Sequence, residues 1–179
     1  AAKWYRLAAK QDNIRSQIQL GFLYWDGKDV GQDWLKAFNW FKLAADQGDP
    51  MSQYLLGNMY EHGLGIKQSP ILAIKWYKLS AEKNFVEAQA ALGTIYWIGS
   101  GVKHDHSIAK KWLLMAAKEN HLMAQANLGS LLSELAEYQN AEKWLLKALD
   151  QIKNNKEENK LSSVQIYDYL GRLYFEQSK

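Results

Sequence analysis

Two sequence markers recur in this chain with the same spacing. Tryptophans follow one another at intervals of 36, 36, 36 and 32 residues, at Trp4, Trp40, Trp76, Trp112 and Trp144. Glycines follow at intervals of 36, 36, 36 and 42, at Gly21, Gly57, Gly93, Gly129 and Gly171. A shared period of this length indicates stacked structural repeats. The chain must therefore fold as an array of similar units.

Each repeat has the apolar pattern of two helices. Leu92, Gly93 and Tyr96 have the spacing of one helical face, and Ala73 and Tyr77 have the spacing of another. A glycine inside a helix costs about 1 kcal/mol relative to alanine, so a packing reason is expected. The repeated glycine therefore predicts a close crossing with the neighbouring helix. The repeat tryptophans are interpreted as core or near-core residues at the helix contacts.

Capping residues predict where the helices begin and end. Asp33, Ser69 and Asp105 stand four residues before a repeated alanine, where their side-chain oxygens can cap a helix. Residues that tolerate a left-handed backbone are placed to end the same helices: Asp12, Gly48, Asn84 and Asn120. The predicted helices are 1–10, 14–26, 34–47, 50–62, 70–83, 86–98, 106–119, 122–134, 138–152 and 162–177.

These expectations define an all-α fold. Ten helices in antiparallel pairs, stacked with a constant period, predict a right-handed α-α superhelix, or solenoid. The chain opens on the second helix of a unit and closes on a first helix, so we expect it to be a fragment of a longer array.

The repeat also resembles a known family. Its pattern of small residue, Gln, Leu-Gly, Tyr, Gly-x-Gly, Ala, Trp-Tyr and Ala-Ala is similar to the Sel-one-like repeats, relatives of the tetratricopeptide repeat. SQYLLGNMYEHGLGIKQSPILAIKWYKLSA, residues 52–81, is a nearly complete match. The resemblance covers residues 1–150, a Sel-one-like solenoid. It predicts a polar insertion at 151–161 and a final tetratricopeptide-like helix at 162–179.

The fourth unit departs from the pattern. From Gly129 to Ala141 there are twelve residues, whereas from Gly93 to Ala109 there are sixteen. This unit has therefore lost its glycine-rich turn. The last helix follows the consensus loosely.

Composition excludes several kinds of protein. The chain has no cysteine, so disulfides and cysteine-ligated metals are excluded. Its formal charge of +3 is too small for a dedicated nucleic-acid binder. No apolar run reaches the ~18 residues that a transmembrane helix needs. A soluble protein is expected. The family resemblance implies a bacterial source, and the choice between cytoplasm and periplasm stays open.

No catalytic motif emerges. His104 and His106 flank Asp105 and resemble metal ligands, but this segment is interpreted as a capped turn. Glu61 beside His62 is interpreted as a surface pair, because adjacent helical residues point apart. Gly63, Gly65, Gly99 and Gly101 recur at fixed repeat positions and are interpreted as turn residues rather than as a phosphate loop. We expect no metal and no cofactor. A hydrolase-like enzyme with a histidine and carboxylate site is the alternative.

The resemblance to tetratricopeptide arrays implies a binding surface. There the first helices line a concave groove, and Trp25 and Trp97 fall one residue beyond Tyr24 and Tyr96, outside the packing stripe. Exposed aromatic residues of this kind are typical binding hot spots. The implied groove residues are Phe22, Trp25, Asp26, Tyr54, Asn58, Glu61, His62, Thr94, Trp97, Ser130, Glu134, Arg172 and Phe175.

Charge indicates the partner. The full set of groove positions contains six acidic side chains, Asp26, Glu61, Glu87, Glu134, Asp168 and Glu176, and two basic ones, Arg15 and Arg172. A groove with excess negative charge repels anions and attracts cations. We expect a non-catalytic module that binds a basic or amphipathic segment of a protein partner, as adaptor, scaffold, or inhibitor such as an immunity protein. Nucleic acid is not an expected ligand.

Overall fold

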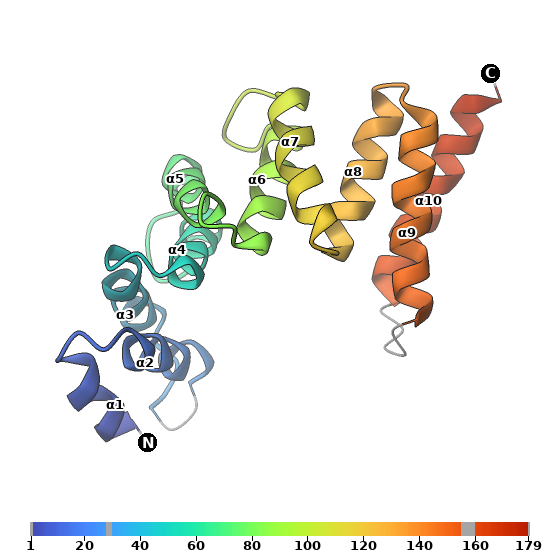
Figure 1. Ribbon diagram of the computed structural model, residues 1–179. Helices are drawn as coiled ribbons and strands as arrows, with labels where there is room; N and C mark the ends of the chain where they lie inside the picture. Colours follow the sequence, from blue (N-terminus) through green and yellow to red (C-terminus); the bar gives the residue numbers. More distant parts are fainter. Residues whose placement is uncertain (1, 28–29, 155–159, 179) are drawn as a thin grey trace. The chain divides into compact units, whose positions relative to one another are not determined.

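The computed structural model describes residues 2–27, 30–154 and 160–178 (Figure 1). Within these ranges the secondary structure consists of ten helices without a strand, which confirms the all-α class. Their bounds are α1 (Ala2–Ala9), α2 (Ile14–Asp26), α3 (Trp34–Asp46), α4 (Pro50–His62), α5 (Pro70–Ala81), α6 (Val86–Ile98), α7 (His106–Lys118), α8 (Leu122–Glu134), α9 (Tyr138–Asn154) and α10 (Lys160–Gln177). The predicted helix ends lie within two residues of these bounds.

The chain divides into two compact units. Unit 1 is Ala1–Ala88 and contains α1 to α5, whereas unit 2 is Gln89–Lys179 and contains α7 to α10. The division falls inside α6. Within each unit, helices that follow one another in sequence pack together, α4 against α5 and α8 against α9 most extensively.

The helix starts are built as the sequence predicts. The side chains of Asp33 and Asp105 accept hydrogen bonds from backbone N–H groups three residues ahead, both at 2.9 Å, and Ser69 does the same at 3.4 Å. The backbone N–H groups of these three residues also donate to carbonyls at the end of the preceding helix, at 2.8–3.0 Å. Each capping residue therefore closes the preceding turn with its backbone N–H and caps the following helix with its side chain.

The helix stops are also confirmed. Asp12, Gly48, Asn84 and Asn120 all have positive φ, between 58° and 91°. Such left-handed residues end a helix by turning the chain out of the helical path. Ala136 joins them with φ 57°, in the shortened turn of the fourth unit. The sequence gives no signal for Ala136, because alanine rarely adopts this conformation.

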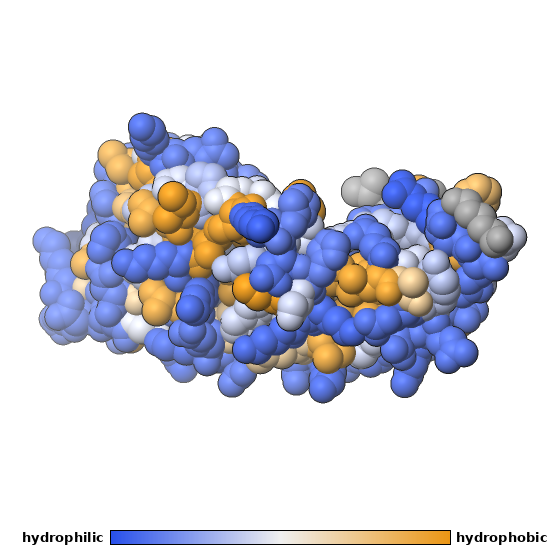
Figure 2. Space-filling model, turned by 90° about the horizontal axis from the view of Figure 1, so that it is seen from above, coloured by the Kyte–Doolittle hydropathy of each residue, from blue (hydrophilic) through white to orange (hydrophobic). Residues whose placement is uncertain are grey.

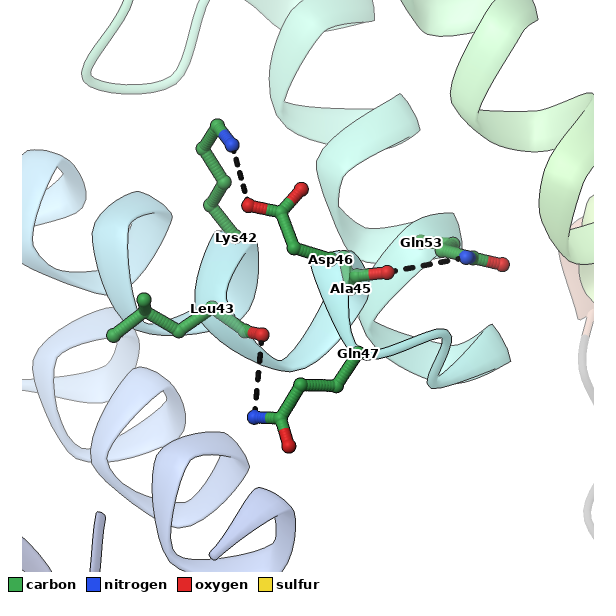
Figure 3. A network of polar contacts seen from close by, with 6 residues as sticks. All are labelled: Lys42, Leu43, Ala45, Asp46, Gln47 and Gln53. Atoms are coloured by element: carbon green, nitrogen blue, oxygen red, sulfur yellow. Dashed lines mark hydrogen bonds and ion pairs between the residues drawn. The ribbon is translucent and has the colours of Figure 1, made fainter. Parts of the chain in front are cut away.

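A buried glutamine joins neighbouring helices in several repeats. The Nε2 atom of Gln53 donates to the carbonyl of Ala45 at 3.2 Å, and Gln125 donates to the carbonyl of Ala117 at 3.1 Å. Figure 3 shows the first of these bonds beside the Lys42–Asp46 ion pair at the end of α3. The glutamine lies four residues before the repeated glycine, so it holds the end of one helix against the start of the next.

The repeated glycines mark helix crossings, as predicted. A Cβ atom on Gly21 would lie 2.3 Å from the Phe41 ring, and one on Gly57 would lie 2.5 Å from the Tyr77 ring. On Gly93 it would lie 2.5 Å from Leu113 Cγ, and Gly129 has the same relation to Leu145. These distances leave no room for a side chain. Gly171 is the exception, because a Cβ there would meet nothing within 4 Å.

The residue after each repeat tryptophan forms the core. Phe41, Tyr77, Leu113 and Leu145 are at most 1% exposed, and they are the residues that meet the glycines. The tryptophans Trp40, Trp76, Trp112 and Trp144 are half-buried, and Trp40 and Trp76 pack against the unit 1 core, which agrees with a near-core position. The expectation is wrong for Trp4, which is 72% exposed.

Apolar side chains at the surface form separate clusters. Figure 2 shows one face, on which hydrophobic residues lie in patches between hydrophilic ones. Across the described residues, no helix is long and apolar enough to cross a membrane.

The insertion predicted at 151–161 is helical at its beginning, because α9 continues to Asn154. Residues 155–159 lie outside the described residues.

The glycine contacts lead to a paired mutational prediction. Gly93→Val should lower the free energy of unfolding by about 1–3 kcal/mol, because its side chain would overlap Leu113. Gly171→Ala should raise it by roughly 0.5–1 kcal/mol, because helical alanine fits there without a clash. Urea melts of both variants and the wild type measure the difference. Equal effects at the two positions would contradict the crossing at Gly93.

Candidate functional site

The predicted groove residues of α2 belong to an aromatic cluster in unit 1. Trp25 packs edge-to-face on Trp34 with ring centroids 4.6 Å apart, and Phe22 packs on Phe41 at 5.2 Å. Trp25 is half-buried and lies against the core. The expectation that it lies outside the packing stripe is therefore wrong, because its ring contacts the rings of both Trp34 and Phe41. Asp26, the next residue, is exposed.

On α4, three predicted residues surround one buried tyrosine. The hydroxyl of Tyr77, from α5, donates to Glu61 Oε2 at 2.6 Å, and Asn58 lies beside it. Tyr54 packs against the Tyr77 ring at 5.6 Å and against Phe85 at 5.5 Å. Tyr54, Asn58 and Glu61 therefore form one connected surface, and all three contact the buried Tyr77 beneath it.

Burial controls the ionisation of these tyrosines. Burial and then the hydrogen bond to Glu61 raise the pKa of Tyr77, while the hydrogen bond with Asn58 acts in the opposite direction. Burial also raises the pKa of Tyr54, and the charges of Glu87 and Glu61 add to the effect. Both hydroxyls stay protonated and can act as hydrogen-bond donors, so neither is suited to act as a base near neutral pH.

The raised pKa of Tyr77 predicts how stability depends on pH. Above pH 10, the ordinary pKa of tyrosine, the unfolded residue loses its proton and the folded residue keeps it. The free energy of unfolding should then fall by up to about 1.4 kcal/mol per pH unit for this group. Tyr77→Phe should be less stable at neutral pH and lose less stability above pH 10. Urea melts at several pH values between 8 and 11 test this, and parallel curves would refute it.

His104 and Asp105, from the segment that resembles a set of metal ligands, stabilise a turn. The Nδ1 atom of His104 lies 2.7 Å from the carbonyl oxygen of Trp97. Gln32 and Gln68 occupy the same repeat position and donate to the carbonyls of Trp25 and Glu61 at 2.9 and 2.7 Å. His104 therefore makes the hydrogen bond that a glutamine makes in the other repeats. His106 is the exposed first residue of α7. The described residues contain no group of three or more His, Cys, Asp or Glu side chains placed to hold a metal ion. His62 is exposed at the end of α4.

This equivalence gives a third prediction. His104→Gln should change the free energy of unfolding by less than about 0.5 kcal/mol, whereas His104→Ala should lower it by about 1 kcal/mol through the lost hydrogen bond. Zinc should leave the melting temperature of the wild type unchanged. Thermal melts of the three proteins with and without zinc test both statements, and a zinc-dependent rise that disappears in His104→Ala would restore a metal site.

In unit 2, two hydrogen bonds connect α6 with α8. Asn127 Nδ2 donates to Thr94 Oγ1 at 3.0 Å, and Trp97 Nε1 donates to Glu134 Oε2 at 2.8 Å. Trp97 is half-buried. Its hydrogen bond fixes the carboxylate of Glu134, another predicted groove residue.

A cavity of about 400 Å³ opens between α8, α9 and α10 of unit 2. Four of the predicted groove residues, Ser130, Glu134, Arg172 and Phe175, line it together. Ser133 lies four residues after Gly129, the offset that Trp25 has from Gly21, and is therefore a groove position too. Ser133 and the groove residue Glu176 complete this part of the wall. The structure thus brings residues of α8 and α10 into one site, although 35 or more positions separate them in the sequence.

Two cavity residues were not predicted. Tyr138 is the first residue of α9, and Tyr169 lies on α10 two positions before Gly171. The signal for Tyr138 was the missing glycine-rich turn, since only three residues separate α8 from α9. Tyr169 had no comparable signal. Gln165 Nε2 donates to its hydroxyl oxygen at 2.7 Å, which orients the phenol.

The cavity combines aromatic rings with charge. Its wall contains three aromatic side chains, two carboxylates and one guanidinium, that of Arg172. Arg172 pairs with Asp168 at 2.9 Å, one helical turn earlier on α10. With Asp168 counted, the carboxylates at and beside the cavity outnumber its one guanidinium. Such a site can hold a polar or cationic group against aromatic surface.

Comparison with protein families places the chain. The model of the Sel1 repeat matches residues 1–13, 14–49, 50–85, 86–121 and 122–151. The chain belongs to the Sel1 repeat family. This confirms the Sel-one-like resemblance. Sel1 repeat proteins are generally protein-interaction modules, and their fold is typically a non-catalytic scaffold.

Solved structures agree with this assignment. The chain is similar to c5321, a protective antigen present in uropathogenic Escherichia coli strains that displays an SLR fold, with 27% identity and a TM-score of 0.81. That match covers 96% of this chain and 41% of the c5321 chain. A Sel1 repeat protein from Oxalobacter formigenes is similar at 28% identity and a TM-score of 0.75, covering 93% of this chain and 76% of that one. The comparison with curated proteins gave no match.

Proposed function

We propose that this protein is a non-catalytic interaction module that binds a peptide segment of another protein on the faces of its first helices. The observation that carries the proposal is the cavity of about 400 Å³ in unit 2, six of whose wall residues occupy groove positions. Its volume is at the lower end of the roughly 300–1,000 Å³ of ligand pockets, so it suits a side chain or a short segment. Phe175 is 61% exposed at its edge and offers a large rigid ring.

A basic or amphipathic segment is the proposed partner. Acidic side chains occupy groove positions in both units, among them Glu61 in unit 1 and Glu134 in unit 2. The aromatic surface formed by Tyr54 and Phe85 supplies apolar contact beside Glu61 in unit 1. Opposite charge would steer such a segment to the protein and increase its association rate.

The proposed biological role is that of an adaptor or scaffold, or of an inhibitor such as an immunity or regulatory protein. Family membership supports the general role, since Sel1 repeat proteins are generally protein-interaction modules. Both solved relatives named above come from bacteria, which supports a bacterial source.

A selected peptide provides the test. A random peptide library is enriched on the immobilised protein, and the affinity of the enriched peptides is measured by calorimetry. Phe175→Ala should weaken them by about tenfold or more, as expected when an exposed aromatic anchor is removed.

Tyr167→Ala is the matched control. Tyr167 is a 55% exposed aromatic residue of the same helix that does not line the cavity, so its removal should leave the affinity within about twofold. Failure to enrich any peptide, or equal losses in both variants, would count against the proposed surface.

A further inference from the structure

We infer that the cavity between α8, α9 and α10 is a receptor for one arginine side chain of the partner. The inference rests on the proposed function and specifies what this cavity recognises. It follows from three features of the wall: its aromatic rings, its carboxylates and the state of its own arginine.

The aromatic residues form the apolar part of the pocket. Tyr138 comes from α9, and Tyr169 and Phe175 come from α10, so rings approach the cavity from two helices. Flat aromatic faces attract cations, and a guanidinium can stack on them as well. An aliphatic side chain would gain from the rings alone, whereas an arginine also uses its charge.

The carboxylate of Glu134 is held in place for a cation. Its Oε2 atom accepts the indole N–H of Trp97 at 2.8 Å, a bond that fixes the side chain without neutralising it. Glu176 adds a second carboxylate to the wall. A guanidinium matches a carboxylate with two parallel hydrogen bonds, which a lysine ammonium does not. Trp97 thus acts as a positioning residue for Glu134.

The guanidinium of Arg172 argues against the binding of a cation in this cavity. A free guanidinium in the wall would favour an anionic ligand, but Arg172 is paired with Asp168 at 2.9 Å. Counting that partner, the charged groups at the cavity are three carboxylates and one guanidinium. The field in the cavity therefore favours a cation over an anion.

Four small probes test the inference: the Nα-acetyl methylamides of arginine, citrulline, lysine and glutamate. Citrulline has nearly the shape of arginine and no charge. Binding is followed by NMR shifts of the labelled full chain, read at the cavity residues. Arginine should bind about tenfold more tightly than citrulline, and glutamate should not bind, because a charged hydrogen-bonded pair is lost in both cases. Lysine should bind less tightly than arginine.

Variants locate the interaction. Glu134→Gln keeps the shape and can still accept the Trp97 bond, but it should reduce arginine affinity by about tenfold. Trp97→Phe should reduce the arginine affinity as well, because it removes the hydrogen bond that positions Glu134 although the carboxylate itself is kept. Glu142→Gln removes a carboxylate of α9 that is bonded to Tyr174 and lies outside the cavity wall, so it should have no effect. Each variant is compared by its melting curve and backbone spectrum.

Three results would overturn the inference. Equal binding of arginine and citrulline would show that the pocket does not recognise charge, and tighter binding of glutamate would assign it to anions through Arg172. The absence of shifts at the cavity with every probe would remove the pocket as a side-chain receptor. None of these results decides the proposed function. That proposal is tested separately, by the enrichment of peptides and by the loss of their affinity in Phe175→Ala.

Discussion

The close contact between a glycine of one helix and a large side chain of the next is the constraint on which this structure depends. A helix packed through ordinary side chains could settle at several positions along its neighbour, but a missing Cβ allows approach at one point only. Phe41, Tyr77, Leu113 and Leu145 occupy that point in four successive repeats. Because the contact recurs every 36 residues in most of the chain, the same crossing is reproduced and the repeat becomes a structural unit.

The polar contacts of the repeat act at the other neighbour of the same helix. The buried Gln53 lies one helical turn before Gly57 and bonds to the end of the preceding helix, so α4 is joined to α3 by the glutamine and to α5 by the glycine. Similarly, the side chains of Gln32, Gln68 and His104 reach carbonyls seven residues earlier only because the turn is folded back over the helix end. Buried polar side chains such as Gln53 and Gln125 cost free energy unless they are bonded, which favours one arrangement of the helices.

Most of the fold could be predicted because its signals are local and repeated. Helix limits follow from capping residues such as Asp33 and from left-handed positions such as Asn84, whose roles depend on a few neighbouring atoms. Burial was harder to predict. The sequence marks Trp76 as strongly as Tyr77, and only the close contact of Gly57 with the Tyr77 ring shows that Tyr77 lies in the core and Trp76 at its edge. The left-handed Ala136 had no local signal, since tertiary packing overrides its preference.

The candidate site was predicted in part for the same reason. Offsets from the glycine locate the faces of α8 and α10, but they do not say where these faces enclose a cavity. Seven residues separate α6 from α7, whereas three separate α8 from α9, so Tyr138 follows closely after the last turn of α8. The ion pair between Lys110 and Glu137 at 2.5 Å holds that short turn from the side of α7 and lowers the pKa of Glu137. The cavity therefore forms where the repeat departs from its own pattern. A regular unit provides a uniform surface, whereas the loss of one turn brings Tyr138 into the wall of the cavity, where it joins the aromatic rings of α10.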